Sequence, residues 1–232
     1  MKKTLLMLGW ACLVFGTTNV RANDQVGTLA QVQGDVKIFS HPGKTMTGPA
    51  PHALYEGETY SVAQAKAGSK VEQGNIVRTA PGSMTRVIYD NGDQLTVSGG
   101  SAYKVNWSNG EGAKAKPDLS LMYGKVRAMV AKGGPRSNLT VRTRSATMGV
   151  RGTDFFVADG GRGPNAGTEI SVIRGEVAVK DHAAKESAKS VPVKAGYSAE
   201  IAAPVVPAAT EQKTATEEKK SRDVKAPAEI AE

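Results

Sequence analysis

Carboxylate side chains are the groups best suited to catalysis in this chain. Their spacing in the sequence does not define a catalytic pair. Asp154, three residues after Arg151, is the acid with the most catalytic character. A glycosidase would need a second carboxyl group several ångströms away, and Glu169 or Glu176 would have to supply it. The sequence alone does not place either acid relative to Asp154, and we expect no enzymatic activity and no catalytic residue. The alternative hypothesis is an enzyme whose turnover depends on Asp154.

Metal and cofactor sites also lack their usual patterns. The histidines His41, His52 and His182 have no histidine four residues away and no nearby cysteine, which disfavours a zinc site. Residues 90–93, Asp-Asn-Gly-Asp, resemble the start of a calcium loop but lack its remaining oxygen ligands. Residues 160–163 lack the Lys-Ser/Thr pair that a phosphate loop needs. We expect no metal ion and no cofactor.

Aromatic and lysine side chains that are interleaved over residues 103–123 are a better indication of binding. Aromatic stacking combined with lysine charge is a usual way to bind glycans and anionic polymers. Two interpretations stay open: an exposed ligand surface, or tyrosines that face the core of a sheet and leave only Trp107 partly exposed. The candidate surface consists of Tyr103, Trp107, Lys114, Lys116 and Tyr123.

The first 22 residues have the features of a signal peptide. A basic start precedes a short apolar run, and Val20 and Ala22 lie where small residues precede a cleavage site. Cleavage before Asn23 also removes Cys12, the one cysteine of the chain, so we expect neither a disulfide framework nor a thiol nucleophile. No segment approaches the ~20 apolar residues that a membrane helix needs. We therefore expect an exported protein of the periplasm or cell envelope, with no transmembrane span after signal cleavage.

The charge balance favours anionic partners. The chain has 30 basic and 22 acidic side chains, and cleavage removes Lys2, Lys3 and Arg21, which leaves 27 basic side chains and a net charge of +5. Such an excess favours an acidic envelope protein or an anionic cell-wall polymer, and the alternative is a solvated surface with a modest charge bias and no partner. Export argues against nucleic acid as a partner. The oligomeric state is left open.

Alternating polar and apolar residues predict many short β-strands. Residues 85–89 and 94–97 flank Asn91-Gly92, the strongest short hairpin signal, in a type I′ turn. Residues 170–173 and 176–179 flank Arg174-Gly175 and predict a second hairpin. A Gly-charged-Val motif recurs at residues 34–36, 124–126 and 175–177, as if each glycine turn led into a strand with its valine facing inward. We expect an all-β fold of stacked antiparallel hairpins, forming a β-roll or sandwich-like domain.

The composition divides the chain into four segments. Prolines and glycines make residues 41–60 a predicted long loop, residues 63–67 are the best helical candidate, and the proline of residues 191–193 suggests an edge strand. Whether residues 26–65 pair with the main sheet stays open. The segments are the signal peptide at 1–22, an N-terminal strand with a Pro/Gly-rich insertion at 23–65, the main β domain at 66–202 and a disordered Ala/Pro/Glu/Lys-rich tail at 203–232.

The most informative stretch is residues 146–157, Ala-Thr-Met-Gly-Val-Arg-Gly-Thr-Asp-Phe-Phe-Val. Gly149 and Gly152 predict a tight turn, with Thr153 next to Asp154 and an Arg151–Asp154 ion pair that fixes this structural turn. The stretch resembles the signature of the FecR domain, with Arg144 in place of a proline. Further FecR-like motifs occur in order between residues 66 and 200, at 71–79, 81–92, 124–127, 168–179 and 193–196.

The resemblance implies an all-β domain in the periplasm or at the cell surface. In the best-known members a cytoplasmic segment and a membrane helix precede the domain and form an anti-sigma regulator. This chain resembles the exported, stand-alone branch, for which the resemblance implies a non-enzymatic binding or scaffold module. Two alternatives stay open: a signalling regulator that contacts a membrane sensor or transporter through its edge strands, and a cell-wall glycan-binding protein.

Overall fold

The computed structural model describes residues 25–46, 51–107, 117–131, 138–161, 166–185 and 188–203. The predicted signal peptide at 1–22, the two lysines Lys114 and Lys116 and all but the first residue of the predicted disordered tail lie outside the described residues. Every regular element among these residues is a β-strand, so the expectation of an all-β fold is confirmed.

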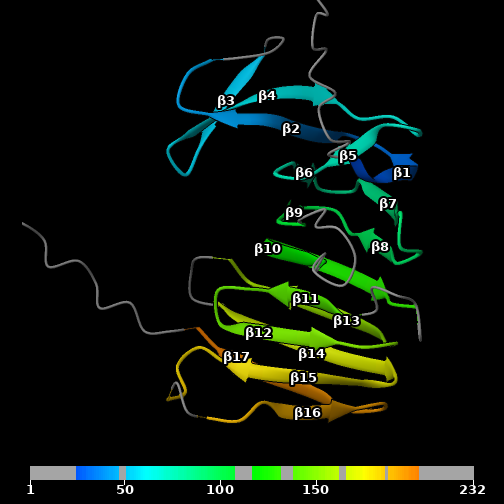
Figure 1. Cartoon of the computed structure of the whole chain (residues 1–232), viewed down its shortest axis with the longest axis vertical. Helices are drawn as coiled ribbons and strands as arrows, with labels where there is room; N and C mark the ends of the chain where they lie inside the picture. Colours follow the sequence, from blue (N-terminus) through cyan, green and yellow to red (C-terminus); the bar gives the residue numbers. More distant parts are fainter. Residues whose placement is uncertain are drawn as a thin grey trace, which may run out of the picture.

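The strands form two layers that share one strand, β10, and the strands of each layer form a stack along the long axis of the molecule (Figure 1). One layer, sheet A, consists in spatial order of β5 (Lys70–Glu72), β1 (Gln25–Gln33), β7 (Met84–Tyr89), β8 (Gln94–Val97), the second half of β10 (Asp118–Met129), β13 (Asp154–Asp159), β14 (Gly167–Arg174) and β17 (Ser198–Ala202).

The other layer, sheet B, packs against sheet A. It consists in spatial order of β3 (His52–Tyr55), β4 (Glu58–Gln64), β2 (Val36–Gly43), β6 (Ile76–Thr79), β9 (Ser101–Val105), the first half of β10, β11 (Leu139–Arg142), β12 (Ala146–Val150), β15 (Glu176–Asp181) and β16 (Val191–Lys194). β10 and β11 are parallel, and the other paired strands are antiparallel. This arrangement agrees with a sandwich-like stack.

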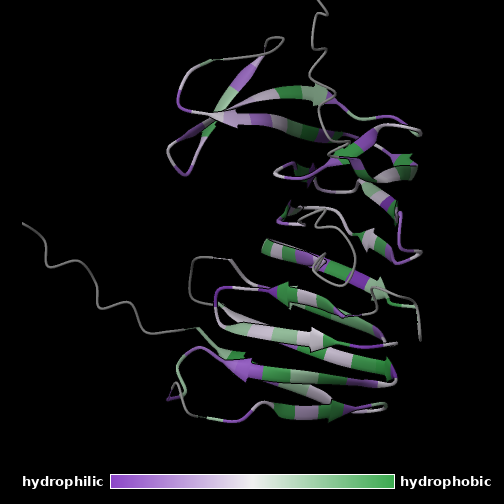
Figure 2. Ribbon diagram, in the orientation of Figure 1, coloured by the Kyte–Doolittle hydropathy of each residue, from purple (hydrophilic) through white to green (hydrophobic). Residues whose placement is uncertain are grey.

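The core lies between the two sheets and follows from the period-2 pattern. In β7, for example, Thr85, Val87 and Tyr89 are buried and the residues between them are exposed. Apolar positions alternate with polar ones along most strands (Figure 2). One continuous apolar cluster runs from Val26 in β1 to Ile201 in β17 and forms the main core of the described residues.

Glycines mark the places where the chain passes from one layer to the other. Gly124 lies inside β10 at a φ of 93°, next to Ser101, whose Oγ accepts the Lys125 N–H at 2.9 Å. An added Cβ at Gly124 would collide with the backbone of Ser101. Each described crossing has such a positive-φ glycine: Gly34, Gly68, Gly74, Gly82, Gly100, Gly124, Gly152, Gly175 and Gly196.

The Gly-charged-Val repeat therefore has a structural basis. In all three copies the glycine sits at a layer crossing and the valine is buried in the core. A hydroxyl from a neighbouring turn bonds to the backbone of the charged residue: Ser83 Oγ accepts the Asp35 N–H at 2.9 Å, and Thr153 Oγ1 donates to the Glu176 carbonyl at 2.9 Å. The prediction of glycine turns with inward-facing valines is correct.

The N-terminal segment belongs to the same sheets as the rest of the chain. β1 pairs with β7, and β2 pairs with β6, so residues 25–64 are continuous with the main layers. The predicted long loop at 41–60 and the helical candidate at 63–67 are both wrong. β2 extends to Gly43, and residues 52–64 form the β3–β4 hairpin, whose turn has positive φ at both Glu56 and Gly57.

One predicted hairpin is confirmed and the other is wrong. β7 and β8 pair around Asn91-Gly92, but only Gly92 has positive φ, so the turn is not type I′. β14 and β15 do not pair with each other, because Gly175 sends the chain from sheet A to sheet B. β16, which contains Pro192, pairs only with β15 among the described strands, as an edge strand should.

No helical segment of the described chain has the length and hydropathy of a membrane span.

Candidate functional site

The FecR-like signature turn is held by an ion pair that the sequence does not suggest. Asp154 pairs with Arg127 in β10 rather than with Arg151, which is exposed. Arg127 Nε and a terminal guanidinium nitrogen donate to the two carboxylate oxygens of Asp154 at 2.9 and 2.8 Å. The Arg151–Asp154 pair is therefore a wrong prediction. The strand pairing explains it, because Met129 of β10 lies opposite Asp154 and places Arg127 within reach.

This pair supports the sheet and leaves little carboxylate chemistry available. The hydrogen bonds from Arg127 lower the pKa of Asp154, and they also raise the pKa of Arg127. The Asp154 side chain is largely buried, and the Arg127 guanidinium lies 5.2 Å from the centre of the Phe156 ring. The Asp154 carboxylate therefore has a structural role.

The two signature glycines have different roles. Gly152 has a φ of 66°, whereas Gly149 has no positive φ and lies inside β12. A Cβ added at Gly149 would make only ordinary contacts near 4 Å with Ala178. The tight turn therefore depends on Gly152 and on Thr153, which is buried and bonds to the Glu176 carbonyl.

The predicted aromatic surface is mostly core. Tyr103 and Trp107 are each 1% exposed, and Tyr89 stacks on Trp107 with ring centres 5.0 Å apart. The Tyr89 hydroxyl donates to the Tyr103 hydroxyl at 3.1 Å, and burial raises the pKa of both phenols. The interpretation that left Trp107 partly exposed is also wrong. Tyr123 is the one described member of the predicted surface that faces solvent in part.

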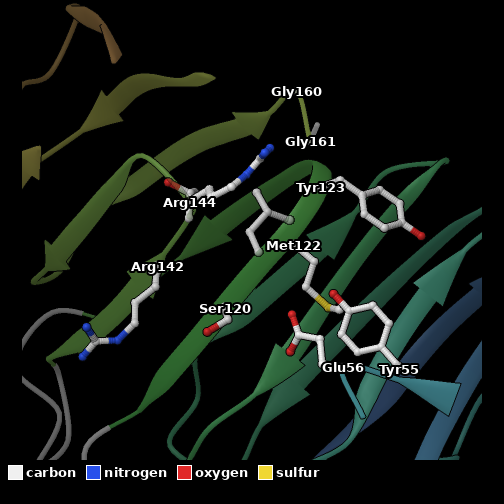
Figure 3. A pocket seen from close by; sticks show the side chains of 11 residues that line it. Tyr55, Glu56, Ser120, Met122, Tyr123, Arg142, Arg144, Gly160 and Gly161 are labelled. Carbon is white, nitrogen blue, oxygen red and sulfur yellow. The ribbon is translucent and has the colours of Figure 1, made fainter. Parts of the chain in front are cut away.

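A different groove lies on the outer face of sheet B, where the tip of the β3–β4 hairpin stands beside β10 and β11 (Figure 3). Its volume is about 810 Å³, large enough for several sugar rings or a short extended peptide. The lining residues come from four places in the sequence: Tyr55, Glu56, Ser120, Leu121, Met122, Tyr123, Arg142, Thr143, Arg144, Gly160 and Gly161.

One wall of the groove is apolar. Tyr55, Met122 and Tyr123 pack against a small second cluster of buried residues, Tyr60, Ile76 and Ala102, on the outer side of sheet B. Figure 3 shows Tyr55, Met122 and Tyr123 on the same side of the groove. This cluster anchors the hairpin to the sheet and fixes the position of the tyrosine rings.

The opposite wall carries two arginines that keep hydrogen-bonding capacity. Arg142 Nε donates to Asp118 at 2.8 Å, and Arg144 lies 3.8 Å from the buried Asp159 carboxylate, beyond hydrogen-bond distance. A guanidinium has five N–H donors, so these contacts occupy a minority of them. The wall can therefore offer charged donors to a carboxylate or phosphate in the groove.

The positive charge continues across sheet B beyond the groove. The strand register places Lys104, Ser120, Arg142 and Thr147 in one row over four neighbouring strands. Adjacent strands are about 4.8 Å apart, so the two cations stand roughly 10 Å apart with a hydroxyl between them. Lys104 also contacts Glu58 at 3.3 Å.

Other candidate groups are dispersed. Among the described residues no group of three or more His, Cys, Asp or Glu side chains could hold a metal ion. His182 bonds to Thr147 Oγ1 and the Arg144 carbonyl, at 2.8 and 2.9 Å. Asp93, at the predicted calcium-like turn, accepts the Ala131 N–H at 3.0 Å, and burial raises its pKa. It is a structural link between the β7–β8 hairpin and the end of β10.

Comparisons with solved structures found partial similarities. Two crystal structures of a candidate anti-sigma factor from Parabacteroides distasonis ATCC 8503 are similar to this chain, each at 16% identity with a TM-score of 0.44. The matched part covers 54% of this chain and 53% of that protein. No curated protein matches the chain.

The fold is an all-β sandwich with a groove on one outer face. The family model described as FecR protein matches residues 75–178, so this part of the chain is a FecR domain. The match contains β10, β11 and the signature turn. The hairpin tip at Tyr55 and Glu56, which completes the groove, lies before the matched residues.

Proposed function

We propose that the protein is an exported, non-enzymatic FecR-domain module of the bacterial periplasm or cell envelope that binds an anionic partner in the sheet B groove. The single observation that carries this proposal is the pairing of a fixed aromatic wall, Tyr55 and Tyr123, with Arg142 and Arg144 across one groove. Stacking surfaces opposite charged donors suit a ligand with a flat or apolar body and a carboxylate or phosphate.

The partner is an acidic envelope protein or an anionic cell-wall polymer. The positive row through Lys104 and Arg142 supports a ligand that extends along the stack and carries repeated negative charges. The arginines are partly exposed, so the contribution of charge is screened by salt, and binding should weaken as ionic strength rises.

Fluorescence anisotropy with labelled oligo-glutamate and labelled polygalacturonate tests this proposal. Arg142→Gln combined with Arg144→Gln should weaken binding at least about tenfold, since hydrogen bonds to charged groups contribute about 1.5–3 kcal/mol each. Arg151→Gln removes one positive charge from an exposed site outside the groove and is the matched control for each of the two single arginine variants. The double variant must keep the thermal stability of the wild type. Equal weakening by Arg151→Gln would reveal non-specific attraction and contradict the proposal.

The second candidate function is a signalling regulator that contacts a membrane sensor or transporter. The FecR match over residues 75–178 favours it, because the resemblance drawn from the motifs includes regulators of that kind. Recovery of one membrane protein in stoichiometric amount, after gentle solubilisation of cells that express the tagged chain, would support it. Retention on purified cell wall in the absence of membrane protein would support the polymer instead.

A further inference from the structure

The edge strand β17 closes one end of the stack, and we infer that it is a docking edge for an extended strand of a partner protein. The proposal is independent of the groove. The preferred partner strand alternates basic and apolar residues, with a lysine or arginine opposite Glu200.

The backbone of β17 has hydrogen-bonding groups directed away from the sheet. The Val172 N–H donates to the Tyr197 carbonyl at 3.1 Å, and the same register continues along β14 and β17. Antiparallel pairs alternate, so Ala199 and Ile201 bond to β14 while Ser198, Glu200 and Ala202 direct their N–H and C=O groups outward. Among the described strands, β17 pairs with β14 alone.

β17 lacks the features that protect the other edges. β16, the matching edge of sheet B, contains Pro192 and Lys194, which blunt strand addition. At the far end of the stack, β5 has three residues and β3 has four. β17 has five residues with neither proline nor lysine, and it accepts an added strand most readily.

The end of the core next to β17 is open. Val191 is 65% exposed, although by alternation it faces the same way as Val193, which is buried in the core. Tyr197, directly before β17, is 68% exposed. An added strand with apolar residues beside Ala199 and Ile201 would cover this end, as a capping repeat covers the end of a solenoid.

Charge determines which strand fits. Glu169 and Glu200 lie directly opposite each other on the outer face of sheet A, and neither forms an ion pair within the described part of the chain. Like charges in this relation destabilise a sheet, and a basic residue on the next strand would relieve the repulsion. A second copy of the chain would bring another Glu200 to the edge, which disfavours symmetric pairing of β17 with itself.

The test is an NMR titration of the full chain with a capped peptide, Thr-Val-Lys-Val-Thr, and with its Glu-for-Lys counterpart. The Lys peptide should shift the amide signals of residues 198–202 and bind about fivefold or more tightly than the Glu peptide. Glu200→Lys should reverse this preference, and Ala202→Pro, which removes an outward N–H without touching the bonds to β14, should abolish binding. Glu72→Lys on β5 is the matched control and should change nothing.

Three outcomes would overturn the inference: no binding of the Lys peptide at millimolar concentration, an unchanged preference in Glu200→Lys, or protection of the outward β17 amides from hydrogen exchange in the protein alone. Self-association that is lost in Ala202→Pro would assign the edge to a second copy instead.

Discussion

Asp154 and Arg127 are joined by two charge-assisted hydrogen bonds, of 2.9 and 2.8 Å, across the β10–β13 pair. This contact links the FecR signature turn to the one strand that both layers share. The signature therefore stabilises the sandwich through β10, and Arg151 contributes little to it.

Loss of the Arg127–Asp154 ion pair should lower stability more than loss of the Arg151 charge. Asp154→Asn leaves the Arg127 guanidinium without its carboxylate and should lower the free energy of unfolding by about 1–2 kcal/mol, a range that allows for the partial exposure of Arg127. Arg151→Gln should stay within about 0.5 kcal/mol of the wild type. Urea denaturation measures both. A larger loss in Arg151→Gln than in Asp154→Asn would contradict the assignment.

The two signature glycines should respond differently to alanine. Gly152→Ala places a Cβ on a residue with a φ of 66° and should cost about 1–2 kcal/mol. Gly149→Ala adds a methyl group within a strand that makes only ordinary contacts with Ala178, and it should be neutral or up to about 1 kcal/mol stabilising. Thermal melts of both variants provide the comparison, and equal destabilisation would show that Gly149 is also required by the turn.

The layer crossing at Gly124 should be among the most sensitive positions of the fold. Gly124→Ala adds the cost of positive φ to a collision with Ser101, and together these should reach roughly 3 kcal/mol or more. Gly196→Ala has the same kind of φ but meets no atom within 4 Å, so only the conformational cost of about 1–2 kcal/mol is expected. Chemical denaturation should rank the two in this order. The reverse order would mean that Ser101 moves aside without cost.

Truncation of Trp107 should lower the stability of the fold and should not remove a ligand contact. Trp107→Ala removes a fully buried ring that stacks on Tyr89 and should cost about 3–5 kcal/mol. Circular dichroism and a thermal melt of the variant measure this loss. A variant that keeps its stability but loses ligand binding would contradict this role and would place Trp107 in a ligand-binding surface.

The sequence predicts the strands well because the signals for strands and tight turns are local. Strand alternation, the hairpin at Asn91-Gly92 and the edge strand at Pro192 each depend on a few neighbouring residues. Two of the wrong predictions, the Arg151–Asp154 pair and the second hairpin, concern long-range partners. The pairing of Asp154 with Arg127 spans 27 residues, and nothing near Gly175 shows that the chain changes layers there instead of forming a hairpin.

The groove was beyond sequence reasoning for the same reason. Tyr55 and Arg142 meet only because the β3–β4 hairpin returns to sheet B and packs on its outer face. Within residues 41–60, the Glu56-Gly57 pair is a turn signal that could have identified the hairpin, since both residues adopt positive φ.

Site-specific photo-crosslinking in intact cells tests the binding account most directly. A photoreactive residue in place of Ser120, inside the groove, should yield a discrete crosslinked product. The same residue in place of Thr28, on the outer side of sheet A, should yield none. An absence of product at Ser120, or the same product from both positions, would contradict a ligand site in the groove.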